Sequence, residues 1–265
     1  MNVTAIIPAL NEAQNIGLVV TELRALRGPD GSALIAEVVV ADNGSSDDTA
    51  ALAAAAGAMV IHVSERGYGH ACAAACAAAL GDVFLFVDGD RTADLSQTPL
   101  LLNEINRGAE LVIGARRDAQ PRSLTLPQRF GNALACALVR LVWRVPISDL
   151  GPFRAIRREA YETIAMQDRS YGWTIEMQIR AAQLHMRVTE VPITWLPRFA
   201  GHSKVSGTVR GVIGAGLGIL SMIARLWMRE RVAGPPKKHV IHPFASSLAG
   251  REQSVVIPTR QPYLK

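Results

Sequence analysis

Short apolar segments alternate with helical patterns over the first 116 residues. The expected strands are Thr4–Ile7, Glu37–Ala41, Met59–Val63, Val83–Val87 and Leu111–Ile113, and the expected helices between them are Asn15–Arg27, Asp48–Ala56, His70–Leu80 and Pro99–Asn106, the last with Thr98 as its cap. This alternation predicts βαβ units, in which parallel strands form one sheet covered by helices. The sequence therefore predicts an α/β fold with a mostly parallel, Rossmann-like sheet.

The fourth apolar segment ends abruptly in acidic residues. Val83–Val87 is followed by Asp88-Gly89-Asp90. In open α/β sheets, ligands bind at the carboxyl ends of the strands. Two carboxylates so close together repel each other unless a cation neutralises them, and oxygen ligands suit Mg²⁺ or Mn²⁺ holding a diphosphate. A solvent-exposed turn is the alternative interpretation of these three residues taken alone.

Two more of the expected strands end in polar residues. Asp42 follows the second strand, where a carboxylate can accept hydrogen bonds from a nucleobase N–H or a ribose hydroxyl, and the first strand ends in the segment 8–12, Pro-Ala-Leu-Asn-Glu. Gly67 and Gly69 precede the third helix and could expose backbone N–H groups to an anion. No G-x-G-x-x-G and no P-loop follows the first strand, which argues against nicotinamide dehydrogenases and mononucleotide kinases.

Positive charge is concentrated in the second half of the chain. The net charge of the chain is +5. The segment from Arg116 to Arg158 contains nine Arg but only two acidic residues, Asp118 and Asp149. Such a block suits phosphate groups, although a solvated surface is also consistent with it. The basic segment has few aromatic residues to stack on bases and no nucleic-acid docking motif, so we do not expect nucleic-acid binding.

Two segments in the second half of the chain could contact a membrane surface. A helix from Leu126 to Val142 places Arg129, Arg140 and Arg144 within about 60° of one another, beside several Leu, as suits an anionic membrane surface or a water-exposed face. The uncharged run from Gly211 to Ala224 is shorter than the roughly 20 residues that span a bilayer. We therefore expect a folded domain over residues 1–208, with a nucleotide-sugar half (1–116) and an acceptor half (117–208). An apolar helix that contacts the membrane would follow at 209–231, and a mobile tail at 232–265.

Cysteine usage and the N-terminus indicate the cellular compartment. The three cysteines follow no C-x-x-C spacing, and Cys72 and Cys76, one helical turn apart, are typical of small buried residues. The first residues read as a strand rather than as a signal peptide. The sequence predicts a cytoplasmic protein, peripheral on the inner face of the cytoplasmic membrane.

Taken together, these motifs resemble those of family 2 glycosyltransferases. The resemblance rests on Pro8–Glu12, on Asp42–Thr49, on Gly67 with Gly69, on Asp88-Gly89-Asp90, on Gly114–Arg116 and on Arg198–Lys204, and covers residues 3 to about 210. The order and spacing of the motifs are most similar to the dolichol-phosphate or polyprenyl-phosphate mannosyl- and glucosyltransferase branch. The resemblance implies the GT-A fold.

The resemblance also implies a donor site. Pro8, Leu10, Glu12 and Asp42 would hold the base and ribose of a UDP- or GDP-hexose, with Gly69 beside them. Asp88 and Asp90 would bind the Mg²⁺ or Mn²⁺ that bridges the diphosphate, and Asp90 is the residue on which turnover would depend. The family often has Gln two residues after the second Asp, where this chain has Thr92.

The acceptor site would use the basic block. Arg116, Arg129, Arg198, Ser203 and Lys204 match positions that surround the donor and acceptor phosphates in this branch. A phosphate monoester has a second pKa of about 6, so it is already a nucleophile and needs cations rather than a base. A sugar hydroxyl would instead require a carboxylate base, for which Glu176 and Asp149 are candidates, unless each simply pairs with a neighbouring Arg.

The sequence therefore predicts an inverting hexosyltransferase that acts on a polyprenyl phosphate. The alternatives are a glycosyltransferase with a soluble or saccharide acceptor, a nucleotidyltransferase, and an inactive nucleotide-binding module. A nucleotidyltransferase would be expected to carry a basic Gly-rich loop after the first strand, where Asn11 and Glu12 stand instead.

Overall fold

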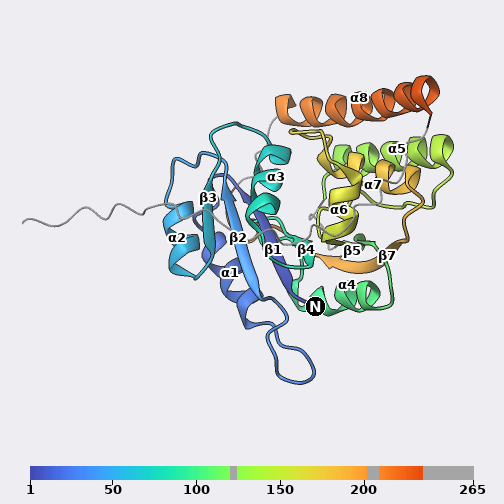
Figure 1. Cartoon of the computed structure of the whole chain (residues 1–265). Coiled ribbons are helices and arrows are strands. Elements are labelled where there is room, and N and C mark those ends of the chain that lie inside the picture. The colour runs from blue at the N-terminus through green and yellow to red at the C-terminus, as the bar shows by residue number, and fades with distance from the viewer. Residues whose placement is uncertain (120–123, 202–208, 235–265) are drawn as a thin grey trace, which may run out of the picture.

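In a computed structural model, which describes residues 1–119, 124–201 and 209–234, the strands form one mixed sheet (Figure 1). The strand order is β3-β2-β1-β4-β6-β5-β7. All neighbouring strands are parallel except β6, which is antiparallel to both β4 and β5. The strands are β1 (Val3–Ala9), β2 (Glu37–Asp42), β3 (Met59–His62), β4 (Val83–Phe86), β5 (Leu111–Ala119), β6 (Arg154–Arg157) and β7 (Val188–Trp195).

The central strands are buried on both faces, as their continuous apolar runs predict. Every residue of β4 is buried, and β1 and β2 are buried along nearly their whole length. The α/β class and the mostly parallel sheet are therefore confirmed. The strand β6 was not predicted, because Arg-Ala-Ile-Arg has no apolar run, and β5 extends well beyond the expected Leu111–Ile113. Because β5 crosses position 116, both halves of the domain share the same sheet.

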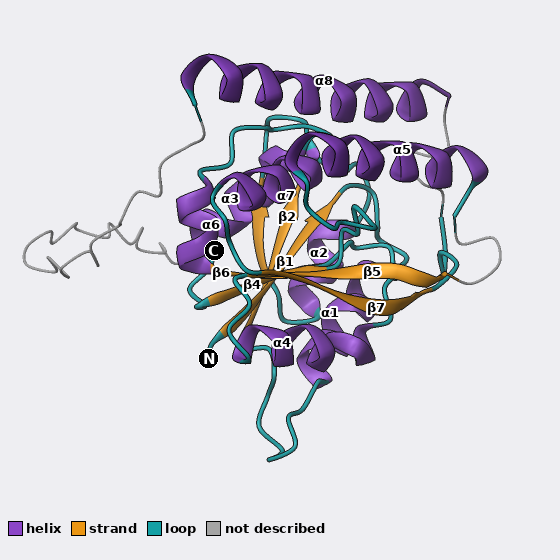
Figure 2. Ribbon diagram, turned by 90° about the vertical axis from the view of Figure 1, so that its right-hand side faces the viewer, coloured by secondary structure: helices purple, strands orange, loops and turns teal. Residues whose placement is uncertain are grey.

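Helices cover the two faces of the sheet (Figure 2). One buried cluster joins residues of α1, α2 and α4 to one face, and a second joins residues of α3, α6 and α7 to the other. Cys72 and Cys76 lie buried on α3 as free cysteines, as expected. The helices are α1 (Ile16–Ala25), α2 (Thr49–Ala55), α3 (Tyr68–Ala78), α4 (Thr98–Asn106), α6 (Arg158–Ile164) and α7 (Trp173–Gln183), with a short 3₁₀ turn, η1, over Leu95–Gln97.

Two long helices form an outer layer above α7. The helix α5 (Leu126–Trp143) begins with a capping box between Thr125 and Gln128, and α8 (Val209–Ala233) runs beside it (Figure 2). A third buried cluster, which includes Val139, Ile179 and Met222, joins α5, α7 and α8. Within the described residues, no helix combines the length and the apolar character needed to cross a membrane.

The predicted helices agree with the structure to within a few residues, with one corrected detail. Thr98 does not cap α4 as predicted but is its first residue, and its hydroxyl donates to the carbonyl of Leu95 (2.7 Å). The difference arises because the 3₁₀ turn η1 leads directly into α4, so that the helix begins one residue earlier than predicted. Of the predicted tail from 232, all residues beyond 234 lie outside the described ranges.

Candidate active site

The carboxyl ends of the parallel strands bring the predicted acidic residues to one edge of the sheet. Ala9 at the end of β1 lies beside Asp42 at the end of β2, and β4, which leads into Asp88, pairs with the other side of β1. The antiparallel β6 starts at this edge, so the segment that precedes it, with Asp149, arrives there too. Residues from β1, β2, β4, β5 and the approach to β6 therefore surround one place.

Asp88 and Asp90 have different surroundings. Asp88 Oδ1 accepts a hydrogen bond from the hydroxyl of Tyr68 (3.1 Å). Asp90 Oδ1 accepts from both the hydroxyl (2.6 Å) and the backbone N–H (3.1 Å) of Thr92. Thr92 thus orients one of the two carboxylates.

The electrostatics at Asp88 fit a divalent cation. Burial, followed by the nearby charge of Asp90, raises the pKa of Asp88 to about 7, because ionising a second carboxyl in a desolvated pair is unfavourable. The charges of Arg116 and Arg198 oppose this rise only in part. Within the described ranges, no group of three Asp, Glu, His or Cys side chains could hold a metal by itself. The two carboxylates are hard oxygen ligands of the kind that Mg²⁺ and Mn²⁺ bind.

Arg198 connects the acidic pair to Glu12. Its Nη1 lies 2.9 Å from both carboxylate oxygens of Glu12, and its Nη2 lies 2.8 Å from Oδ2 of Asp90. Asn15 Nδ2 donates to Glu12 (2.9 Å) and to the carbonyl of Ala200 (3.1 Å). Arg198, predicted to bind an acceptor phosphate, is therefore placed among the acids predicted to bind the donor.

The acids expected to hold the nucleoside lie in two interlocked loops. Asp42 is 5% exposed, and its Oδ1 accepts from the backbone N–H of Ser45 (3.1 Å) while its Oδ2 lies 3.4 Å from Nδ1 of His62. The loop after β1 is joined to it, since Glu12 N donates to the hydroxyl of Thr49 (2.8 Å). Pro8 pairs with β2 inside the sheet, and half-buried Leu10 follows β1 at the same edge.

Arg116 and Asp149 form a mutual ion pair at the end of β5. Arg116 donates to Asp149 through its backbone N (2.7 Å), Nε (2.8 Å) and Nη2 (2.6 Å). Burial disfavours the charge on Asp149, but the hydrogen bonds and charge of Arg116 outweigh it and lower the pKa of the carboxyl. Arg116 also approaches Oδ1 of Asn132 on α5 (3.4 Å). Arg129, one helical turn before Asn132, is exposed.

Glu176 belongs to a different environment. It is 1% exposed on α7, where its carboxylate accepts from Arg180 Nε (2.9 Å) and from the backbone N–H groups of Gln167 and Asp168 (each within 3.1 Å). These contacts hold the loop before α7 in place. Both candidate bases thus pair with a neighbouring Arg.

Packing requires glycine at both positions at the start of α3, and the binding of an anion by the Gly69 N–H stays a prediction. A Cβ on Gly69 would lie 2.6 Å from the carbonyl oxygen of Asp168, and one on Gly67 would lie 2.2 Å from that of Arg169. The N–H of Gly67 donates to Asn43 Oδ1 (2.8 Å). The two glycines therefore allow the 168–169 backbone to approach α3.

Two site residues were not foreseen from the sequence. Tyr68 contacts Asp88, and burial raises the pKa of its hydroxyl well above the usual value. Arg154 on β6 is 1% exposed and donates to the carbonyls of Gly151, Leu150 and Thr174, and burial lowers its pKa to about 10. The only sequence signal for Arg154 is its position five residues after Asp149. The predicted acceptor ligands Ser203 and Lys204 lie outside the described residues.

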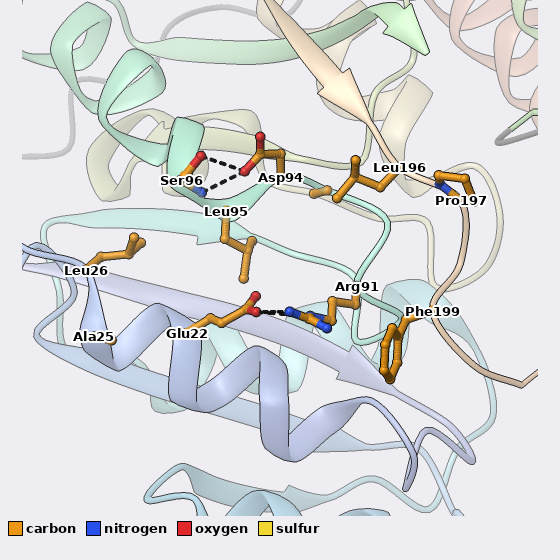
Figure 3. A pocket seen from close by; sticks show the side chains of 11 residues that line it. Glu22, Ala25, Leu26, Arg91, Asp94, Leu95, Ser96, Leu196, Pro197 and Phe199 are labelled. Carbon is orange, nitrogen blue, oxygen red and sulfur yellow. Dashed lines mark hydrogen bonds and ion pairs between the residues drawn. The ribbon is translucent and has the colours of Figure 1, made fainter. Parts of the chain in front are cut away.

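A cavity of about 450 Å³ lies beside this edge, between the C-terminal part of α1 and the segments 91–96 and 196–199 (Figure 3). Its wall includes Leu26, Leu95 and Phe199, together with the ion pair between Glu22 and Arg91. None of Glu12, Asp42, Asp88 and Asp90 lines it, so it is distinct from the acidic site.

Comparisons with known proteins agree on one family. Residues 4–165 match the model described as "Glycosyl transferase family 2". The chain is 36% identical over 211 residues to an uncharacterized glycosyltransferase of Mycobacterium tuberculosis (80% of this chain, 93% of the relative). It is 31% identical to the undecaprenyl-phosphate mannosyltransferase of Micrococcus luteus (80% and 90%).

A solved structure shares the fold. Glucosyl-3-phosphoglycerate synthase of Mycobacterium tuberculosis, in complex with Mn²⁺, uridine-diphosphate-glucose and phosphoglyceric acid, superposes with a TM-score of 0.66 at 25% identity. The match covers 84% of this chain and 80% of that one. The GT-A-like fold expected from the motifs is thereby confirmed.

Proposed function

Because this chain belongs to glycosyl transferase family 2, we propose that it transfers a hexose from a nucleoside-diphosphate sugar to the phosphate of a polyprenyl phosphate, with inversion at the anomeric carbon. The observation that carries this proposal is that each of the two candidate bases is ion-paired with an Arg. Asp149 is bound by Arg116 and Glu176 by Arg180, so neither carboxylate is placed to take a proton. An acceptor that is already ionised needs no such base.

The donor side of the proposal uses the acids at the sheet edge. Asp42 and Glu12, in their interlocked loops, would bind the ribose and base, while Asp88 and Asp90 would hold Mg²⁺ or Mn²⁺. Such an ion, when bound, supplies positive charge where the departing diphosphate becomes negative. Tyr68 and Thr92 each hold one of these two carboxylates in a fixed orientation.

The acceptor side uses the cations beside these acids. The side chain of Arg116 is 15% exposed, and Asp149 holds it in one orientation. The guanidinium N–H groups that do not bind Asp149 can therefore donate to a phosphate with little further loss of side-chain entropy. Arg129 lies on α5 one helical turn before Asn132, which Arg116 approaches, and Arg198 reaches the same edge of the sheet through Asp90. The relative from Micrococcus luteus, whose name specifies undecaprenyl phosphate, supports this class of acceptor.

We also propose that the outer face of α5 and α8 contacts the inner surface of the cytoplasmic membrane. Leu126, Phe130 and Leu141 are between 70% and 81% exposed and lie on the side of α5 opposite its buried residues Ala135 and Val139. Arg129, Arg140 and Arg144 flank this stripe and are exposed. Apolar and cationic side chains in this arrangement suit an anionic lipid surface.

A second candidate is transfer to a soluble phosphorylated acceptor. The observation that favours it is the fold shared with glucosyl-3-phosphoglycerate synthase, which is bound to phosphoglyceric acid in its structure. The same cations would then dock a small phosphate monoester, and the lipid surface would play no part in the reaction.

The test is release of the nucleoside diphosphate by the purified protein. UDP-glucose and GDP-mannose are each offered with Mn²⁺ or EDTA, and with a polyprenyl phosphate, 3-phosphoglycerate or no acceptor. Release that requires both the metal and the lipid phosphate is expected. Release that requires 3-phosphoglycerate favours the second candidate, and nucleotide binding without release under any combination contradicts both and indicates a binding module.

A further inference from the structure

The segment after β7 closes over the acidic site and is called here the strap, residues Leu196–Gly201. It is fastened at three points. Leu196 N donates to the carbonyl of Thr92 (2.8 Å), Arg198 binds Glu12 and Asp90, and the carbonyl of Ala200 accepts from Asn15 (3.1 Å). The strap therefore joins residues that lie more than a hundred positions away in the chain.

Arg198 supplies the charged fastening. Its side chain is 18% exposed, and its guanidinium joins the carboxylates of Glu12 and Asp90, whose side chains are 8% and 16% exposed. Charge-assisted hydrogen bonds in such a partly buried place are stronger than neutral ones. The guanidinium thus occupies the space between an acid of the proposed nucleoside pocket and an acid of the proposed metal pair.

The apolar packing of the strap is light. Phe199 is 62% exposed and contacts the guanidinium of Arg91, whose carbon lies 5.0 Å from the ring centre. The cavity of about 450 Å³ lies against Leu196, Pro197 and Phe199 (Figure 3). Because this side of the strap is not packed against a core, its position depends largely on the polar fastenings.

By contrast, the strand that leads into the strap is firmly attached. Gln97 and Thr194 exchange two hydrogen bonds, Gln97 Nε2 to Thr194 Oγ1 (3.1 Å) and Thr194 N to Gln97 Oε1 (2.8 Å). Trp195 is 4% exposed. A movement of the strap would therefore begin at Leu196 and leave β7 in place.

We propose that Arg198 is a latch that holds the strap closed on the empty donor site. It is displaced from Asp90 when a divalent cation binds there, and it then pairs with the diphosphate of the nucleotide. The inference rests on the proposed function, because it takes the acidic edge to be the donor site. The ligand class is a divalent cation with a nucleoside diphosphate, and the new element is the competition with a residue of the chain itself.

The argument for displacement is electrostatic. A divalent cation on Asp90 would stand within a few ångströms of the guanidinium, and like charges at that separation repel strongly in a partly buried site. A diphosphate reverses this penalty, since its oxygens offer Arg198 a new anionic partner. The metal alone should then bind weakly, and the diphosphate should strengthen its binding by removing the competition.

The latch is tested by direct measurement of Mn²⁺ binding, from the electron paramagnetic resonance signal of free Mn²⁺, with and without UDP or GDP. Arg198→Gln removes the charge, Arg198→Lys keeps it, and Arg107→Gln removes an exposed charge from the distant C-terminal end of α4 as a matched control. We expect Arg198→Gln to bind Mn²⁺ alone about threefold to tenfold more tightly than the wild type. We expect UDP or GDP to enhance that binding less than in the wild type, and the Arg107→Gln control to behave like the wild type. Arg198→Lys, which keeps the positive charge but not the two-nitrogen bridge, should bind Mn²⁺ alone less tightly than Arg198→Gln.

A second measurement uses the wild-type protein and therefore does not require that a variant folds. Hydrogen exchange of the wild-type amides 196–201 should accelerate when Mn²⁺ is added, while amides of β7 keep their protection. Unchanged Mn²⁺ affinity in Arg198→Gln, or unchanged exchange in the strap while Mn²⁺ binds, overturns the latch but leaves the proposed function standing. If neither Mn²⁺ nor nucleotide binds the wild type, the proposed donor site itself is wrong.

Discussion

The guanidinium of Arg116 binds the carboxylate of Asp149 side-on, with Nε 2.8 Å from Oδ2 and Nη2 2.6 Å from Oδ1. The two residues are 33 positions apart and come from β5 and from the approach to β6. In the proposed reaction, Asp149 would therefore position Arg116 rather than accept a proton.

Asp149→Asn should lower kcat/KM by about tenfold to a hundredfold, because Arg116 loses its orientation and its counter-charge. The shape of the pH–rate profile should not change, which steady-state kinetics between pH 5.5 and 9 can establish. Arg116→Lys, which keeps the charge but not the paired geometry, should show a comparable loss. Disappearance of an acidic limb, the fall in rate at low pH, in the Asp149→Asn profile would instead identify Asp149 as a base.

Glu176→Gln should affect stability more than catalysis. The carboxylate is buried with Arg180 and two backbone N–H groups, so its neutralisation leaves a poorly compensated cation and should cost about 2–4 kcal/mol of unfolding free energy. Urea unfolding measures this loss. The folded fraction, assayed at low temperature, should retain activity within about threefold of the wild type. A loss beyond about a hundredfold in a folded variant would point to a saccharide acceptor with Glu176 as its base.

Asp88→Asn should stabilise the metal-free protein at alkaline pH. The folded-state pKa of about 7 lies above the ordinary 3.8, so the stability that the protonated carboxyl contributes is present below about pH 4 and is lost as the pH rises through 7. Asn cannot ionise. In EDTA at pH 8 the variant should therefore be more stable by about 1–3 kcal/mol, and the difference should vanish near pH 4.

Urea unfolding at the two pH values provides the measurement for Asp88→Asn. Mn²⁺ should stabilise the wild type at pH 8 but not the variant, and hexose transfer should be lost. A variant that is less stable than the wild type at pH 8 in EDTA would contradict the unfavourable ionisation of Asp88.

Gly69→Ala should be strongly destabilising. The added Cβ would lie 2.6 Å from the backbone oxygen of Asp168 and 2.7 Å from two backbone carbons of Arg169, and backbone atoms cannot move aside as a side chain can. A loss of about 2–4 kcal/mol is expected in thermal or urea unfolding. Gly131→Ala on α5 is the matched control, because nothing lies within 4 Å of its Cβ, and it should stabilise by up to about 1 kcal/mol. Equal effects of the two substitutions would contradict the packing role of Gly69.

The outer face of α5 should carry vesicle binding. The double substitution Phe130→Ser with Leu141→Ser removes two side chains that are 70% and 77% exposed, and should weaken binding to vesicles with anionic lipid by at least about tenfold. Co-sedimentation measures this change. Leu80→Ser, at an 81% exposed position after α3, is the control and should bind like the wild type. Equal binding of all three proteins would exclude this face as the membrane contact.

The local pattern of the sequence was sufficient for the sheet and for the acids at its edge. Apolar runs that end in Asp42 and in Asp88 predicted both the parallel strands and the edge of the sheet at which these acids lie. This succeeds because the burial of a central strand and the position of its carboxyl end follow from periodicity and chain direction, which are local properties. The family resemblance rests on the same short motifs.

The tertiary structure decided how the charged residues pair. Arg198 lies 108 residues from Asp90 in the chain, and the position of Arg154 in an antiparallel strand could not be read from a segment without an apolar run. Tyr68 reaches Asp88 only because α3 packs against β1 and β2. Sequence spacing specifies which residues share an edge, but contacts between distant side chains depend on strand order, on the antiparallel insertion of β6 and on the path of the strap. These are set by packing of the whole chain, which is why the same carboxylates that read as candidate bases in the sequence are ion-paired in the fold.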